Sequence, residues 1–158
     1  MRKPILFIGL ALLAAIGGFY WYSNQPEQQI NGAIDDFLEA IDHQKISMET
    51  DEEVRKTLDE VVAERVSIVG VPRVAEAPLN IDFLARKISE FHQLTTLCEI
   101  VEESRTLSII GSKAQAERIV TVTVAGVGFR REDTWKLVFS LEESDRWRIR
   151  TIRAKPVN

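Results

Sequence analysis

The segments AERIVTV at 116–122, WKL at 135–137 and DRWRI at 145–149 decide the fold of this chain. Each places apolar and polar side chains alternately, which is the two-residue period of a β-strand with one buried face. Turn signals separate them at 111–112, 126–131 and 142–145. We therefore predict that the chain beyond Thr96 forms an antiparallel meander of about four strands.

Before these strands the apolar residues recur at three- and four-residue steps, which is typical of amphipathic helices. Such a pattern, which begins at Ile30, predicts a first helix that runs to about His43 or Lys45, with Pro26 suited to its first turn. Thr50 and Glu53 form a capping box for a second helix. A third helix is predicted for 80–95, and a short strand or helix end for 64–71. Helices segregated from strands indicate an α+β fold, with three helices packed on one face of a curved antiparallel sheet.

This order of elements resembles the nuclear transport factor 2-like superfamily, a cystatin-like α+β cone in which three helices fold over a curved sheet. The resemblance covers roughly Ile30 to Ile152, and it is most specific where an acidic turn precedes Trp147, a basic residue and Ile149. The superfamily includes isomerases, dehydratases, polyketide cyclases, ligand binders and assembly modules. The resemblance therefore implies a fold and not one activity.

The N-terminal 22 residues have the features of a membrane anchor. Arg2 and Lys3 form a basic start, and no charged side chain occurs from there to Pro26. The 18 residues 5–22 would span about 27 Å as a helix, close to one hydrocarbon core, and end in the aromatic sequence FYWY. Some bacterial members of the superfamily are attached to the inner membrane by one such helix. We expect a transmembrane anchor at 1–22, a linker at 23–29 and the folded domain at 30–155.

The positive-inside bias of Arg2 and Lys3 predicts the orientation of the chain. It holds the N-terminus in the cytoplasm and places residues from Ser23 onward on the other side of the inner membrane, which is the periplasm in a Gram-negative cell. A cleaved signal peptide is the alternative, with Ala15-Ile16-Gly17 as a weak cleavage site. Both alternatives predict the same extracytoplasmic location for the domain.

Composition excludes several classes of function. After Lys3 the chain has 18 basic and 24 acidic residues, a net charge of −6, which argues against a nucleic-acid binder. Cys98 is the single cysteine, so no internal disulfide can form, and a small buried hydrophobe is its simplest role. Two histidines 49 residues apart provide no metal-ligand spacing, and no Gly-rich loop precedes a helix. We therefore expect no metal and no cofactor.

Candidate catalytic residues are few. The resemblance implies that an enzyme of this superfamily would place a general base and a hydrogen-bond donor inside the cone. Both tyrosines, Tyr20 and Tyr22, lie in the predicted anchor, so the commonest donor is missing from the domain. The remaining weak candidates are His92 and a carboxylate of the first helix, represented by Asp36. The alternative for His92 is a helix-surface histidine at the edge of the core.

Two further surfaces follow from the strand pattern. The aromatic face of the sheet and the apolar faces of the first and third helices predict a small apolar pocket. Its expected lining residues are Phe37, Phe91, Trp135, Phe139 and Trp147. On the opposite face of the last strand a row of guanidinium groups could bind an anionic partner, or form an ordinary solvent-facing surface. This row consists of Arg146, Arg148 and Arg150.

The missing donor–base set and the expected anchor favour a membrane-tethered extracytoplasmic module for interaction or ligand binding, without catalysis. A protein partner or homodimer through the exposed sheet face is the expected mode, and a small apolar ligand is a second expected partner. One alternative is a small-molecule enzyme or carrier that uses the cone interior through His92 and Asp36. Another is an envelope assembly factor that binds anionic groups.

Overall fold

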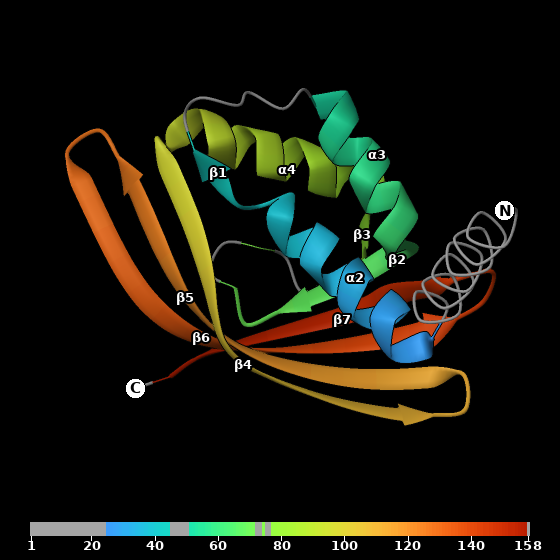
Figure 1. The fold of residues 1–158 in the computed structure, drawn as a ribbon. Helices are drawn as coiled ribbons and strands as arrows, with labels where there is room; N and C mark the ends of the chain where they lie inside the picture. The colour runs from blue at the N-terminus through green and yellow to red at the C-terminus, as the bar shows by residue number, and fades with distance from the viewer. Residues whose placement is uncertain (1–24, 45–50, 72–73, 75–76, 158) are drawn as a thin grey trace, which may run out of the picture.

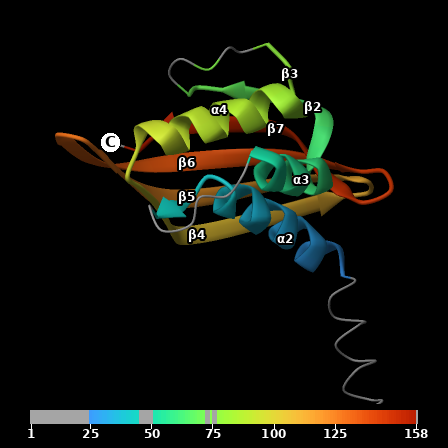
Figure 2. The same ribbon diagram turned by 90° about the horizontal axis from the view of Figure 1, so that it is seen from above.

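The computed structural model describes residues 25–44, 51–71, 74 and 77–157, and in them three helices lie in the concavity of a strongly curved sheet (Figure 1). The helices are α2 (Pro26–Glu39), α3 (Asp51–Val61) and α4 (Ile81–Leu94). Seen from above, α2 runs beside β4 whereas α4 lies over the other side of the sheet (Figure 2). The α+β class and the three helices agree with the prediction.

The count of about four strands is wrong, because the described residues form seven. They are β1 (His43–Gln44), β2 (Val62–Val69), β3 (Leu79–Asn80), β4 (Leu97–Ile110), β5 (Lys113–Gly126), β6 (Phe129–Glu143) and β7 (Trp147–Pro156). Their order across the sheet is β1-β4-β5-β6-β7-β2-β3. Strands β4 to β7 are the predicted antiparallel meander. The unpredicted strands are β1 and β3, each two residues long. Strand β2, which pairs in parallel with β7, corresponds to the short strand or helix end predicted at 64–71.

The predicted transmembrane anchor at 1–22, with the membrane-contacting residues 5–22, lies outside the described residues. Within residues 25–44, 51–71, 74 and 77–157, no helix combines the length and the apolar character needed to cross a bilayer. The fold that the structure describes is therefore the α+β domain alone.

One helix boundary differs from the sequence prediction. Helix α2 ends at Glu39 and not near His43, because His43 and Gln44 pair with Cys98 and Leu97 of β4. Helix α4 begins at the predicted place: the Asn80 side chain accepts a hydrogen bond from the Phe83 amide at 2.8 Å, which satisfies one of the free N–H groups of the first turn. Thr50, the predicted cap of α3, lies outside the described residues.

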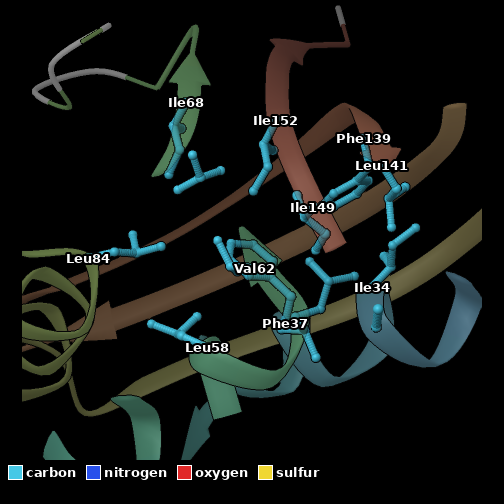
Figure 3. Close-up of a cluster of buried hydrophobic side chains, with 14 of the residues drawn as sticks. Ile34, Phe37, Leu58, Val62, Ile68, Leu84, Phe139, Leu141, Ile149 and Ile152 are labelled. Carbon is cyan, nitrogen blue, oxygen red and sulfur yellow. The ribbon is translucent and has the colours of Figure 1, made fainter. Parts of the chain in front are cut away.

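The core fills the space between the helices and the concave face of the sheet (Figure 3). Phe139 of β6 is fully buried, and the Phe37 ring of α2 meets its ring edge-on, with centroids 6.2 Å apart. Val62, Ile149 and Leu58 extend this apolar layer toward α3, and none of the three is exposed. Burial of these side chains fixes the helices over one half of the concave face.

Curvature comes from irregularities in the long strands. Strands β4 and β5 have 14 residues and β6 has 15, so flat strands of this length would splay away from the helices. The β4–β5 pairing shifts register between Glu102 and Ser104, and the β6–β7 pairing shifts between Ser140 and Leu141. Such bulges bend the strands and increase their twist, which closes the sheet around the helices.

Candidate functional site

An apolar cavity of about 450 Å³ lies between the helices and the concave face of the sheet. Its walls come from α2, α4, the end of β2 and the segment after it, and strands β4 to β7. The lining side chains are Phe37, Leu38, Ile41, Ile68, Val71, Val74, Leu84, Lys87, Ile88, Phe91, Ile100, Val120, Val122, Trp135, Leu137, Ile152 and Ala154. Its volume lies in the range of about 300–1,000 Å³ typical of small-molecule sites.

The structure divides the five predicted pocket residues into two groups. Phe37, Phe91 and Trp135 line the cavity. Phe139 and Trp147 do not line it, because the packed core encloses them with 0% and 3% of their surface exposed. The cavity is therefore displaced along the sheet toward α4, away from the end where α2 and α3 pack most closely.

His92 and Asp36, the weak catalytic candidates, are not among the lining residues. The Nε2 atom of His92 lies 3.1 Å from the Ile41 carbonyl oxygen, so the ring donates there in the tautomer with a proton on Nε2. Asp36 is exposed on α2. Partial burial of its carboxyl, followed by the negative charges of Glu39 and Glu60, raises the pKa of this group. Neither the Ile41 contact of His92 nor the charges around Asp36 join these two side chains.

His92 instead belongs to a pair of stacked imidazoles. Its ring lies 4.5 Å from the ring of His43, with an interplanar angle of 25°. His43 Nε2 lies 3.3 Å from the Thr95 carbonyl oxygen, at the end of α4. His43, which follows α2, therefore contacts a carbonyl at the end of α4, and His92 of α4 contacts a carbonyl that follows α2. The pair joins the end of α4 to the chain after α2.

The predicted anion-binding arginines are engaged within the domain. Arg148 Nη1 donates to the carbonyl oxygens of Asp59 at 2.5 Å and Val62 at 3.2 Å, where α3 ends. Carbonyls at a helix end have no partner within the helix, so the guanidinium stabilises this end. Arg150 Nε lies 3.2 Å from a Glu142 carboxylate oxygen, and Arg146 Nε lies 3.5 Å from one of Asp145.

Asp145 completes this arrangement. Hydrogen bonds from Arg148, and then from Ser144, hold the pKa of its carboxyl well below the usual range. Arg148 thus joins the β6–β7 turn to the end of α3. Each of the three arginines thus already faces a carboxylate or a carbonyl of the domain.

A buried charged cluster beneath α2 escaped the sequence analysis. The Arg118 side chain of β5 is 0% exposed, and its Nε lies 3.0 Å from a Glu102 carboxylate oxygen, within ion-pair distance but without hydrogen-bond geometry. Its Nη2 donates to Asn31 Oδ1 of α2, and its Nη1 donates to the Glu117 carbonyl at 3.4 Å. Burial lowers the pKa of Arg118, against the charge of Glu102 that raises it.

The sequence did contain a signal for this cluster. Arg118 occupies a position in the alternating run that otherwise carries Ala and Val on the buried face. A charge there must be paired once the strand packs, and its partners come from α2 and β4. Burial also raises the pKa of the nearby Asp35 carboxyl, although Arg105 and Arg118 lower it.

Cys98 is buried, with 1% of its surface exposed. Burial, and to a smaller extent the charge of Asp42, raises the pKa of its thiol to about 12. A thiol in this environment is a small hydrophobe and a poor nucleophile. No group of three or more His, Cys, Asp or Glu side chains in the described part of the chain is arranged to hold a metal ion.

Comparison with known proteins relates the domain to one fold. No family model and no curated protein matches the sequence. A nuclear transport factor 2-like protein with a cystatin-like fold from Novosphingobium aromaticivorans superposes with a TM-score of 0.62 at 17% identity, over 100% of this chain and 92% of that one. A candidate dehydratase of the same family from Streptomyces avermitilis gives 0.65 at 16% identity, over 84% and 97%.

A third solved structure extends the comparison to another named activity. A candidate ketosteroid isomerase from Shewanella frigidimarina superposes with a TM-score of 0.59 at 12% identity, over 80% of this chain and 94% of that one. Identities this low establish the fold and leave the activity open. The chain therefore has the nuclear transport factor 2-like, cystatin-like fold.

Proposed function

We propose that this chain is a membrane-attached, extracytoplasmic module that binds a small apolar ligand in its cavity without transforming it. The observation that carries the proposal is the lining of the cavity, where sixteen of the seventeen side chains are apolar. A ligand that enters gains by removing its own apolar surface from water. Ligand pockets are mostly apolar, with a few polar groups that orient the bound molecule.

The same lining argues against catalysis in the cavity. General acid–base chemistry needs an ionisable side chain within about 3 Å of the reacting atom, or one water away from it. Lys87 is the single ionisable residue among the lining residues, and its ammonium is paired with Glu90 at 2.6 Å. An enzyme that uses His92 and Asp36 is the alternative proposal, but neither residue is among the lining residues of the cavity.

Filling the cavity tests ligand binding. The full chain is held in lipid nanodiscs, and its unfolding temperature is measured with and without the apolar dye N-phenylnaphthylamine. Binding to the folded state alone adds about 1.4 kcal/mol at ten times Kd, which raises the unfolding temperature by about 5 °C for a domain of this size. Leu137→Trp replaces a lining side chain with a larger one that fills the cavity, and it is expected to abolish this rise.

Val138→Trp is the matched control. It makes a similar change one residue along β6, where the side chain faces the other side of the sheet and does not line the cavity. The dye should therefore raise the unfolding temperature of Val138→Trp as it does that of the original chain. Each shift is taken relative to the same variant without dye, so a change in basal stability does not affect the result. An equal rise in Leu137→Trp and the original chain would contradict the proposed site.

Membrane attachment is the second part of the proposal, and it is supported by the sequence alone. The basic residues Arg2 and Lys3, the uncharged run 5–22 and its aromatic end favour a single crossing with the domain outside the cytoplasm. We expect the full chain to stay with the membrane after alkaline extraction, and the domain to be cut by protease added to spheroplasts, from which the outer membrane has been opened. Release by alkali, or protection until the spheroplasts are lysed, would overturn this part. A homodimer or protein partner stays a prediction from the sequence.

A further inference from the structure

One charged side chain lies at the wall of the apolar cavity. Lys87 is the exception among seventeen lining residues, and its side chain is half exposed. A lysine in this position lays its methylene groups along the apolar wall and keeps its ammonium at the water-facing edge. The cavity is therefore apolar in its interior and positively charged at one point of its rim.

The surroundings of Lys87 strengthen this asymmetry. Its Nζ lies 5.5 Å from the centre of the Phe83 ring, and the Arg86 guanidinium carbon lies 5.4 Å from the same centre. Two cations of α4, one of them the cavity residue Lys87, thus lie near one aromatic ring. Lys87 Nζ donates to a Glu90 carboxylate oxygen at 2.6 Å, but an ammonium has three N–H donors. One carboxylate leaves donors available for a second anion.

Glu90 competes only weakly with a second anion for the Lys87 ammonium. Both side chains are about half exposed, at 50% and 48%, and they lie three residues apart on the outer surface of α4. Exposed pairs of this kind contribute little, because water and salt screen them. An anion fixed by an apolar body inside the cavity needs no further ordering to reach Lys87, so it competes well with a mobile glutamate side chain.

We propose that the ligand is an amphiphile with an apolar body and one anionic headgroup, whose body fills the cavity and whose anion binds Lys87. This inference rests on the proposed function, because it assigns the chemistry of the ligand in the same cavity. A cationic headgroup would meet the like charge of Lys87. A neutral one would leave the ammonium without the additional anion.

The test compares three single-chain amphiphiles with the same apolar tail: dodecanoate, dodecyl phosphate and dodecanol. The full chain in nanodiscs is titrated with each, and Kd is obtained from the rise in unfolding temperature. We expect the anions to bind about fivefold tighter than the alcohol, which is the upper range for a partly exposed ion pair. Partition into the lipid is the same for every variant, so the ratio between variants reports the protein.

Two substitutions should change the anion preference in opposite directions. Lys87→Gln removes the ammonium and keeps a side chain of similar length, so the advantage of dodecanoate over dodecanol should disappear. Glu90→Gln removes the competing carboxylate, so the advantage should grow. Lys56→Gln, an exposed lysine of α3 outside the cavity lining, is the control and should leave all three affinities unchanged.

The outcomes separate this inference from the proposed function. If dodecanol binds and Leu137→Trp blocks it, but Lys87→Gln leaves the dodecanoate ratio unchanged, the cavity is a ligand site and the anion assignment is wrong. If none of the amphiphiles stabilises the protein, the proposed function itself fails. A preference for the phosphate over the carboxylate supports the inference and indicates a phospholipid-like source, whereas the reverse preference supports it and indicates a fatty acid.

Discussion

Glu102→Ala is expected to lower the free energy of unfolding by about 3 kcal/mol, because it leaves the buried guanidinium of Arg118 without its carboxylate. The Arg118 side chain has no exposed surface, so solvent screens its charge poorly. The contacts with Asn31 and the Glu117 carbonyl remain, and they keep the loss at the lower end of the range for broken buried ion pairs. Urea unfolding followed by circular dichroism measures the change.

Two further variants distinguish a buried charge from a generally sensitive strand. Glu99→Ala removes an exposed carboxylate from the same strand and should change stability by less than about 0.5 kcal/mol. The double variant Glu102→Leu with Arg118→Leu removes both charges, and it should recover most of the loss, since apolar replacements of buried pairs are often neutral. If the double variant is as unstable as Glu102→Ala, the cost does not arise from the unpaired guanidinium.

Gly70→Ala is expected to be the most damaging of the glycine substitutions, at about 3 kcal/mol, because it combines backbone strain with a steric clash. Gly70 follows β2 and has φ of +85°, which side-chain-bearing residues rarely adopt. A Cβ atom there would lie 2.0 Å from the Ala154 carbonyl oxygen of β7. Backbone atoms cannot rotate away as a side chain can, so β2 would have to move from β7.

Gly128→Ala distinguishes the effect of backbone strain from that of the steric clash. Gly128 has nearly the same φ, +82°, but a Cβ atom there would meet nothing within 4 Å. Its substitution should cost only the strain of the backbone conformation, about 1 kcal/mol. The difference in urea midpoint between the two variants therefore measures the clash with Ala154. Equal losses would show that the close approach of β2 to β7 does not determine the role of Gly70.

Much of the fold could be predicted because its signals are local. Strands β5, β6 and β7 each contain a run in which apolar and polar side chains alternate, so the period identifies them. Strands β1 and β3 have two residues each and carry no period at all. The parallel pairing of β2 with β7 joins segments about 80 residues apart, such as Ile68 with Ile152, and no local pattern indicates which strand will be the neighbour.

The candidate site was less accessible to prediction than the fold. Three aromatic residues of the cavity wall could be predicted from the apolar faces of their helices and strand: Phe37, Phe91 and Trp135. Phe139 shares the face of Trp135, yet it is fully buried beneath Phe37 whereas Trp135 borders the cavity. Alternation tells which face a side chain occupies. It does not tell whether a helix packs on that part of the face or leaves a space there.

The sequence by itself determined the period of each long strand, the amphipathic faces of the helices and the position of one charge, Arg118, on a buried face. These properties depend on neighbouring residues, so they can be read along the chain. Only the tertiary structure decided that Glu102 and Asn31 lie against Arg118, that Gly70 lies against Ala154, and that Lys87 borders an apolar cavity. Such contacts join distant segments, and they are fixed when the sheet curves around the helices and excludes water from the space between them.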